Sequence, residues 1–551
     1  MSEKLPSTRL PGRLSILLAC VAFAVAGLRI NHGQAESGLP PGAGLTIDES
    51  FNIHQGYLLY TALIDHGPGI LTPEGTKQVF GGRNYLPDHP PLGRLLLGLA
   101  HEWVGPFLSG AEETGFNVPA ARLGSCFAFA VTVLLLSEFA ARTFDPRTAL
   151  VAGVALILMP RVVGHARLAA LETATTLAWW AALLPLLAWW TSKEPPTAKQ
   201  ACISGAMWGL LLLTKVQGIL FPPLVFLWAI YRFRQRAALP LALFGVCGAA
   251  IFVAGWPWLW LDPVANLQKF LGHSAVIAED GAKNIPVRPS LYAWYFGHRF
   301  TDKLVPWHYP FVMTLLTIPA CVTVPLILRC ARGRFSPTEV LLGLSAVWPL
   351  IVFAIPGTPV YDGTRLFLVI MPALALLAAR GAVDSKRRRP VLVLCLALAI
   401  PAALNVVSPF AINSYSALAG GTSGAQSLAM ESGYWADGLN EDFWNQVPEG
   451  SIVYVAPVSH QFQLPVLEQM SPVVRKRGIR LVAFEYDVER QRGLLLLIHR
   501  LADLRPALRE IPDGARLVTE IRHGSSVLAR LIDTTDAEWD SVPDWPADMV
   551  D

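Results

Sequence analysis

The sequence predicts a polytopic α-helical membrane protein with about eleven transmembrane helices and a small C-terminal α/β domain outside the cytoplasm. Three observations predict this fold class. The 551 residues are 53% hydrophobic and only 15% charged, against roughly 25% charged in soluble domains. Apolar runs that suit a membrane-spanning helix recur through residues 1–410. Residues 411–551 are charged and alternate strand-like with helical patterns, as in a small α/β domain.

The apolar runs define a membrane domain over residues 1–410. They lie at about 13–30, 118–141, 147–160, 168–190, 200–214, 216–231, 238–261, 309–328, 338–356, 364–380 and 391–410. The first run follows a basic N-terminus and lacks a clear cleavage site, so it is interpreted as an uncleaved helix. The seven cysteines lie in or beside apolar runs, and the chain has no CxxC or Cys/His metal pattern.

Basic residues gather in alternate connections between the runs. They are Lys4, Arg9 and Arg13; Arg142 and Arg147; Lys193 and Lys199; Arg232, Arg234 and Arg236; Arg329, Arg332 and Arg334; and Arg380 with 386–389. The positive-inside rule makes this side cytoplasmic. We therefore expect a multi-pass protein of the cell (inner) membrane, with a cytoplasmic N-terminus and an extracytoplasmic C-terminal domain. The net charge of +3 is too small to indicate nucleic acid as a partner.

The opposite side then holds a first loop at 31–117, a short turn at 161–167, a turn at Lys215, a loop at 262–308 and a turn at 357–363. Within the first loop, 50–64 and 92–104 suit helices that lie in the membrane interface. In the tail we expect strands at 451–456, 479–484, 516–519 and 526–531, and helices around 462–477 and 488–504. The tail lacks a nucleotide-binding glycine motif, and we expect an accessory domain that helps acceptor access.

The first loop carries two motifs. Thr46-Ile47-Asp48-Glu49 fits a capping box, in which Glu49 serves the start of a helix. In the alternative interpretation, Asp48 takes a proton from an acceptor hydroxyl, as a positioned carboxylate can. The second motif is Asp88-His89-Pro90-Pro91-Leu92, where two prolines impose an extended turn. His89 is either a loop anchor or a contact to a phosphate. A cationic ring would favour the phosphate contact.

Three further residues stand near the outer ends of apolar runs. Glu172 follows Arg167 at a membrane boundary, where a carboxylate is tolerated without a function. Lys215 either snorkels to the interface or binds an anionic lipid head, and Arg365 has the same two interpretations. All these groups face one compartment at one depth, while the helix centres hold almost no charge. A coupled transporter would carry ionisable groups near the midplane, so the pattern counts against transport.

Over roughly residues 40–380 the motifs resemble those of the GT-C membrane glycosyltransferases, in particular the protein O-mannosyltransferase and aminoarabinose transferase group (glycosyltransferase family 39-like). Asp48-Glu49 resembles the acidic pair of that family's first loop, which carries the catalytic aspartate. His89-Pro90-Pro91-Leu92 resembles its HPPL element near the lipid phosphate. Glu172 stands where relatives usually have Asp, and the segments at Lys215 and Tyr361–Arg365 are similar to later family elements. The tail lacks the β-trefoil pattern of eukaryotic protein mannosyltransferases.

The resemblance implies a hexosyl- or pentosyltransferase that moves a sugar from a polyprenyl-phosphate donor to a hydroxyl of a lipid, glycan or protein acceptor at the outer membrane face. Its implied site residues are Asp48, Glu49 and Glu172 as catalytic groups, His89, Lys215, Arg365 and Arg167 at the donor phosphate, and Asp88 and Tyr361 at the substrate. The donor is already activated, so no metal is chemically required, although a divalent metal stays open. The alternatives are a transporter or flippase of lipid-linked sugar and a non-catalytic subunit of an envelope glycan assembly system.

Overall fold

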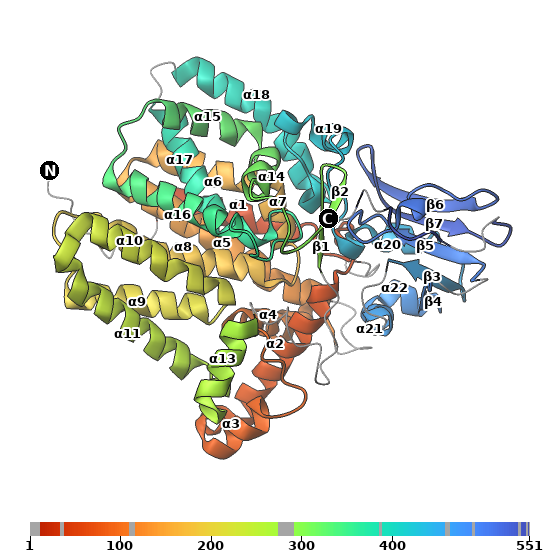
Figure 1. Cartoon of the computed structure of the whole chain (residues 1–551), viewed down its shortest axis with the longest axis horizontal. Helices are drawn as coiled ribbons and strands as arrows, with labels where there is room; N and C mark the ends of the chain where they lie inside the picture. The colour runs from red at the N-terminus through yellow and green to blue at the C-terminus, as the bar shows by residue number, and fades with distance from the viewer. Residues whose placement is uncertain are drawn as a thin grey trace.

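The protein consists of a helical body and a mixed α/β tail that meet at one end of the body (Figure 1). The computed structural model describes residues 12–32, 38–108, 116–273, 291–384, 388–457, 463–486, 491–537, 542–546 and 549. The basic residues expected at Lys4, Arg9, Lys386 and Arg387 lie outside the described residues. Short 3₁₀ turns join many of the longer elements.

Each of the eleven predicted apolar runs is helical. The body helices are α1 Arg13–Gly27, α5 Val118–Thr143, α6 Pro146–Ile157, α8 Leu171–Pro185 with the π-turn η4 Leu186–Trp190, α9 Ala198–Leu212, α10 Phe221–Phe233, α11 Ala238–Gly255, α14 Tyr309–Thr317, α15 Ala320–Ala331, α16 Pro337–Phe353, η8 Arg365–Ile370 with α17 Met371–Val383, and α18 Arg388–Val407. Long apolar sequences favour helices because a bilayer offers no partner for free backbone groups.

Fewer helices in the described part of the chain are long enough to cross a membrane than there are predicted apolar runs. Among the described residues, five helices are long and apolar enough to span, or up to seven if each of two bent pairs is one span. The run at 309–328 is one such pair, because α14 and α15 meet at 119°. Pro319 follows the extended Ile318 there and cannot continue a helix. The run is therefore not one straight helix, and eleven crossings stay a prediction.

The turn expected at 161–167 is wrong, since Pro160–Ala166 forms helix α7, bent by 69° from α6. Pro160 occupies the first position of this helix, which proline favours. A short helix, rather than a simple turn, therefore connects α6 to the segment that carries Glu172.

The first loop forms α2 Ile47–His66, α3 Pro73–Phe80 and α4 Pro91–Val104, which confirms the helices expected at 50–64 and 92–104. Helices α2 and α4 cross at Gly56 and Gly98, where a Cβ on Gly98 would lie 2.1 Å from the Gly56 carbonyl oxygen. This close approach needs glycine at both positions. It fixes the start of α4, and with it His89, against the helix that carries Asp48. Helix α12 Trp258–Leu261 ends the apolar run at 238–261. The loop expected at 262–308 contains α13 Pro263–His273 and the hairpin of β1 Tyr292–Tyr295 and β2 His298–Thr301.

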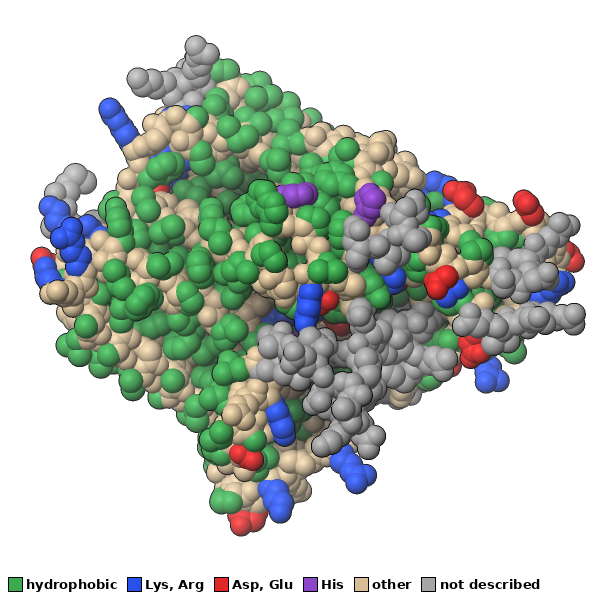
Figure 2. All heavy atoms as spheres, viewed as in Figure 1, with side chains coloured by type: hydrophobic (Ala, Val, Ile, Leu, Met, Phe, Trp, Pro, Cys, Tyr) green, Lys and Arg blue, Asp and Glu red, His purple; other side chains and the backbone are tan. Residues whose placement is uncertain are grey.

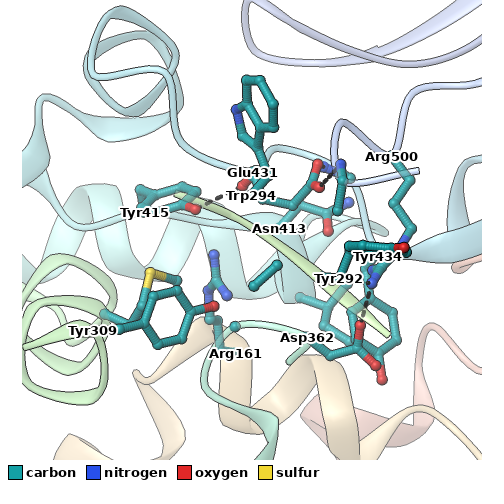
Figure 3. Close-up of a pocket in the computed structure, with 16 residues that line it drawn as sticks. Arg161, Tyr292, Trp294, Tyr309, Asp362, Asn413, Tyr415, Glu431, Tyr434 and Arg500 are labelled. Carbon is teal, nitrogen blue, oxygen red and sulfur yellow. Dashed lines mark hydrogen bonds and ion pairs between the residues drawn. The ribbon is translucent and has the colours of Figure 1, made fainter. Parts of the chain in front are cut away.

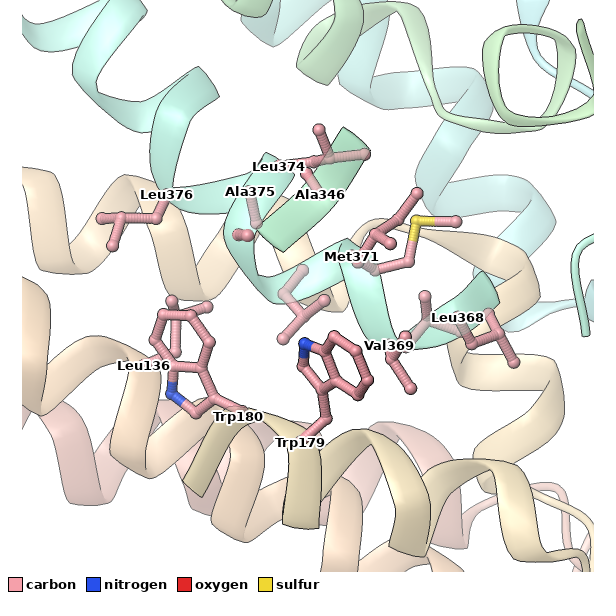
Figure 4. Close-up of a cluster of buried hydrophobic side chains, with 14 of the residues drawn as sticks. Leu136, Trp179, Trp180, Ala346, Leu368, Val369, Met371, Leu374, Ala375 and Leu376 are labelled. Carbon is pink, nitrogen blue, oxygen red and sulfur yellow. The ribbon is translucent and has the colours of Figure 1, made fainter. Parts of the chain in front are cut away.

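Much of the buried core of the body lies where α8 packs against α5 and η8, beside α17 and α16 (Figure 4). Trp179 and Trp180 of α8 are almost completely buried, in one cluster with Leu136 of α5 and with Leu368 and Val369 of η8. Large aromatic side chains contribute much of the buried apolar area in such a core. The packing holds the first residues of α8 and η8, which carry Glu172 and Arg365, on one side of the body.

The tail contains a five-stranded sheet of order β4-β3-β5-β7-β6. Its strands are β3 Ile452–Ala456, β4 Arg480–Ala483, β5 Leu494–Ile498, β6 Arg516–His523 and β7 Ser526–Asp533, and its helices are α19 Gly421–Ser427, α20 Glu441–Trp444, α21 Gln463–Met470 and α22 Pro472–Lys476. Strand β3 pairs parallel with β4 and β5, whereas β7 pairs antiparallel with β5 and β6.

Four predicted strands of the tail and the helical segment near 462–477 are confirmed, but the helix expected at 488–504 is wrong. Its centre, Leu494–Ile498, is the middle strand β5, whose residues 495–497 are fully buried. A strand covered on both faces reads as a continuous apolar run, which sequence alone does not separate from a buried helix.

The surface agrees with the charge pattern of the sequence. Hydrophobic side chains cover much of the visible face of the body, while basic side chains gather at its edge farthest from the tail (Figure 2). Exposed basic residues of the connections include Arg142, Arg147, Lys193, Lys199, Arg234 and Arg236. The positive-inside rule predicts that this edge faces the cytoplasm and that the tail lies on the other side.

Single cysteines placed in a cysteine-free variant test this orientation. Arg83→Cys in the first loop and Asp513→Cys in the tail change exposed residues. Both are expected to react with an impermeant maleimide in intact, outer-permeabilised cells. Gln235→Cys, in the exposed basic connection after α10, is the control and is expected to react only after lysis. Protection of the first two sites with labelling of the third would reverse the orientation.

Candidate active site

Arg365 is the centre of a charge network that joins three distant segments of the chain. Its Nε donates to Glu172 Oε1 at 2.7 Å, its Nη1 donates to Asp362 Oδ2 at 3.0 Å, and its Nη2 donates to Asp48. The side chain is 12% exposed. A guanidinium presents several donors in a fixed plane, so one arginine can hold three carboxylates at once.

Lys215 completes the inner side of the network. It lies between α9 and the 3₁₀ turn η5 Val216–Leu220, and its Nζ donates to Glu172 Oε1 at 2.7 Å. Both side chains are buried, with 6% of Lys215 and 1% of Glu172 exposed. The snorkelling interpretation of Lys215 is therefore wrong. The second carboxylate oxygen of Glu172 is buried without a hydrogen-bond partner in the described part of the chain.

Asp48 differs from the other two carboxylates because it is open to solvent. Its side chain is 44% exposed, against 1% for Glu172 and 2% for Asp362. It stands in the first turn of α2, where the capping role falls to its neighbours. An accessible carboxylate beside a fixed cation has the geometry of a general base that a substrate hydroxyl can reach.

Glu49 has a structural position. Its carboxylate accepts from the Thr46 N–H at 2.9 Å and the Ala169 N–H at 2.8 Å. It also binds Arg122 Nε at 2.7 Å and Nη2 at 2.8 Å, and neither side chain is exposed. Burial acts to raise the pKa of Glu49, but the Arg122 guanidinium and these hydrogen bonds hold it below its ordinary value. The capping interpretation of Glu49 is confirmed, and its buried carboxylate does not point to substrate.

In the second motif, too, one residue is held by an arginine and its neighbour is not. Asp88 accepts from Arg94 Nη1 at 2.8 Å and Nη2 at 3.0 Å, and the Arg94 side chain is 1% exposed. Burial lowers the pKa of His89 to about 3, with Arg94 and Lys215 acting in the same direction and Asp88 against it. The ring is therefore neutral near pH 7, and a cationic His89 is wrong for this state. Its Nδ1 is buried without a partner among the described residues.

Arg167 contacts no described member of the charge network, whereas Tyr361 lies beside it. The Arg167 guanidinium donates to the carbonyl oxygens of Ser408 at 2.7 Å, Val406 at 2.7 Å and Val25 at 3.0 Å. It joins the ends of α18 and α1, and this arrangement does not support the phosphate contact expected for it. Tyr361 stays beside the network, with its ring centre 6.0 Å from the Arg365 guanidinium carbon.

Three members of the network were not among the expected site residues. Asp362 binds Arg365 on one side and Arg500 of the tail on the other, at 2.7 Å. Trp435 donates its indole N–H to the same carboxylate at 3.4 Å. The sequence placed Asp362 on an outer turn, and a positive φ of 56° beside Gly363 at 68° shapes that turn. Arg500 carries no local signal, because only the fold brings it to Asp362.

A small pocket borders the network where the tail meets the body. It is lined by Asp362, Tyr434 and Arg500, and by Arg161, Tyr309, Tyr415 and Glu431 among others (Figure 3). The Arg161 guanidinium carbon lies 4.7 Å from the centre of the Tyr415 ring. Within the described ranges, no group of three or more His, Cys, Asp or Glu side chains is arranged to hold a metal ion.

Residues 88–260 match the sequence model of the family described as dolichyl-phosphate-mannose-protein mannosyltransferase. The matched segment contains His89, Glu172 and Lys215, while Asp48 and Arg365 lie outside it. Over these residues the match confirms the predicted resemblance to the protein mannosyltransferases. No curated protein matches the chain in sequence.

Solved structures of low sequence identity align with much of the chain. ArnT from Cupriavidus metallidurans in the apo state is 15% identical, with 94% of this chain and 97% of that chain covered and a TM-score of 0.49. The oligosaccharyltransferase AglB from Archaeoglobus fulgidus is 13% identical, with 96% and 75% covered and a TM-score of 0.46. The Saccharomyces cerevisiae Pmt1-Pmt2 complex is 17% identical, with 53% and 39% covered and a TM-score of 0.32.

The buried pair of Glu49 and Arg122 gives a stability prediction. Glu49→Gln leaves Arg122 buried without its counter-charge, which typically destabilises by roughly 3–5 kcal/mol. We expect a marked drop in the thermal unfolding temperature of the detergent-solubilised protein. Glu194→Gln, which removes the partner of Arg236 in an exposed pair, is the control and should change little. An unfolding temperature of Glu49→Gln equal to that of the control would contradict the structural role.

Proposed function

We propose that this protein is an integral-membrane glycosyltransferase that moves a hexosyl or pentosyl group from a polyprenyl-phosphate donor to an acceptor hydroxyl at the outer face of the membrane. The observation that carries the proposal is the position of Arg365, which joins the solvent-open Asp48 to the buried Glu172 and Lys215. The match of residues 88–260 to a dolichyl-phosphate-mannose-protein mannosyltransferase family supports the same chemistry.

The reaction is a single displacement at the anomeric carbon. Asp48 takes the proton of the acceptor hydroxyl as the acceptor oxygen forms its bond to that carbon. The bond from the anomeric carbon to the phosphate oxygen breaks, and its electron pair leaves with the lipid phosphate. Lys215 and Arg365 stabilise the charge that develops on that oxygen, as preorganised cations do. The new bond therefore has the opposite anomeric configuration to the donor.

Donor binding changes the partner of Arg365. In this structure its Nη2 is held by Asp48, so an incoming phosphate competes with that carboxylate. Asp48 is the member of the network that water can solvate after release, because 44% of its side chain is already exposed. The exchange places the phosphate on Arg365 and frees Asp48 to act as a base. Neutral His89 contributes a ring nitrogen without adding charge.

Glu172 holds the two cations in place. One of its oxygens binds both Lys215 and Arg365 at 2.7 Å. With 1% of its side chain exposed, it is poorly placed to contact an acceptor. We assign Glu172 to positioning of the two cations. The carboxylate of an aspartate, which relatives usually have at this position, can serve the same purpose.

Asp48→Asn tests the base. The variant keeps the size of the side chain and removes the proton acceptor, so transfer is expected to fall by roughly 10²–10⁴. Donor affinity should be equal to or tighter than that of the wild type, because the competing carboxylate is gone. Transfer is measured with a radiolabelled polyprenyl-phosphate sugar and donor binding with the same lipid in nanodiscs. Transfer within a few-fold of the wild type would remove Asp48 from the mechanism.

Lys215→Gln tests the phosphate site. A charge-assisted hydrogen bond contributes about 1.5–3 kcal/mol, so donor affinity should fall by roughly 10- to 100-fold. Lys77→Gln, which changes an exposed lysine of α3, is the control for altered charge in the outer loop. If both variants bind donor as the wild type does, Lys215 does not contact the phosphate.

The alternatives predict other results from the same preparations. A flippase moves the labelled donor lipid across a vesicle bilayer without transfer and without the need for Asp48. A non-catalytic subunit shows neither activity in pure form and gains none with any donor. Transfer by the purified wild type, lost in Asp48→Asn with donor binding intact, supports the glycosyltransferase against both.

A further inference from the structure

We propose that Arg500, in the tail, is a positioning residue of the active site, which acts through Asp362 to set where Arg365 stands. The inference rests on the proposed function and adds to it that the tail is part of the catalytic arrangement. The tail was expected to be an accessory domain that helps acceptor access, and the contacts of Arg500 connect it directly to the charge network.

The Arg500 side chain is buried at the boundary between tail and body, where its contacts with Asp362 and Asp503 lie. Its Nη2 contacts Asp362 Oδ1 at 2.7 Å and its Nε contacts Asp503. Its guanidinium carbon lies 4.1 Å from the centre of the Trp435 ring, which donates to the other oxygen of Asp362 at 3.4 Å. Figure 3 shows Arg500 reaching Asp362 from the tail side of the pocket. Only 3% of the Arg500 side chain is exposed.

The backbone around Arg500 makes this reach rigid. Strand β5 ends at Ile498, and the Arg500 N–H donates to the Ile498 carbonyl oxygen at 2.7 Å, which turns the chain sharply. The N–H groups of Leu501 and Ala502 donate to the Glu431 carboxylate at 3.0 and 2.9 Å. Arg299 of the body hairpin donates to the Ala502 carbonyl oxygen at 2.7 Å. These bonds fix the backbone from which the Arg500 side chain extends, and the contacts with Asp362, Asp503 and Trp435 hold its guanidinium.

Asp362 transmits this position because it is shared. One oxygen faces Arg500 and the other accepts from Arg365 at 3.0 Å. A buried carboxylate with two cations divides its attraction between them, so loss of Arg500 leaves Asp362 to Arg365 alone. Arg365 is then drawn toward Asp362 and away from Asp48. Arg500 thus controls the distance between the guanidinium and the proposed base.

The charged and titratable groups that face Asp362 come from several elements. They are Arg365, Arg500, Tyr309, Tyr361 and Tyr434. Burial acts to raise the pKa of Asp362, and the Arg500 and Arg365 guanidiniums hold it below its ordinary value. Without Arg500 the pKa rises, so Asp362 takes up a proton at a higher pH and releases Arg365. Activity that needs ionised Asp362 is then lost at a higher pH as the solution is acidified.

The test compares kcat and its pH dependence in the full-length protein. Arg500→Ala is expected to lower kcat at neutral pH by roughly 10- to 100-fold, as small misplacements of catalytic groups do, and to move the acid limb of the profile to higher pH. Arg530→Ala, which removes another tail arginine paired to Glu520, is the control and should keep the wild-type profile. A profile of Arg500→Ala identical to that of Arg530→Ala overturns the inference.

Two further variants guard against loss of folding. Arg500→Lys keeps the charge and should restore the acid limb toward the wild type with part of kcat. Asp362→Asn removes the titrating carboxylate, so the added Arg500→Ala change should alter neither kcat nor the profile further. If Arg500→Ala still lowers kcat tenfold in the Asp362→Asn background, Arg500 acts by another route and the inference fails.

A structural measurement separates this inference from the proposed function. A cryo-EM structure of Arg500→Ala in nanodiscs should show Arg365 shifted toward Asp362 with its contact to Asp48 lost. If the wild type transfers no sugar from any polyprenyl-phosphate donor and this shift is seen, the proposed function fails while the positioning role stands. An unmoved Arg365 overturns the positioning role whatever the activity.

Discussion

The arrangement of the end of the body that meets the tail depends on one arginine held by three carboxylates. A buried guanidinium is tolerated only when its charge is matched, and Arg365 finds its matches on α2, on α8 and on its own turn. Each buried carboxylate in turn needs a second cation, which is Lys215 for Glu172 and Arg500 for Asp362. Asp48 lacks such a second cation among the described contacts and is solvated instead. The need to match charge therefore connects the first loop, the body and the tail.

Neighbouring charged residues in the two loop motifs have divided roles. Glu49 is fixed by Arg122, and Asp88 is fixed by Arg94, each in a pair with a buried arginine. These pairs anchor the backbone directly beside Asp48 and His89, the residues that face the network. A side chain that must hold a catalytic geometry is more precise when its neighbours are locked. In each motif, one residue is therefore fixed by a buried arginine, and its neighbour faces the charge network.

Much of this was predictable from sequence, because membrane helices and capping motifs are local patterns. The apolar runs gave the helices, and Thr46–Glu49 gave the start of α2. The site residues that the sequence did not reveal depend on tertiary contacts. Arg500, for example, contacts Asp362, which lies 138 positions earlier in the chain. The strand at Leu494–Ile498 was misread because burial on both faces hides its period. The neutral state of His89 follows from burial that no sequence window reports.

The charge count of the network explains why Asp48 is the residue that yields to a donor. Three cations, Lys215, Arg365 and Arg500, already meet four carboxylates, Asp48, Glu172, Asp362 and Asp503. A lipid phosphate adds a further negative charge, so it binds only if a carboxylate withdraws. Withdrawal of Glu172 or Asp362 would leave a buried charge without a partner, which is costly. Asp48 withdraws into water, because 44% of its side chain is already exposed and water can solvate the released carboxylate. The most exposed carboxylate is therefore both the one that donor binding releases and the one that an acceptor hydroxyl can reach.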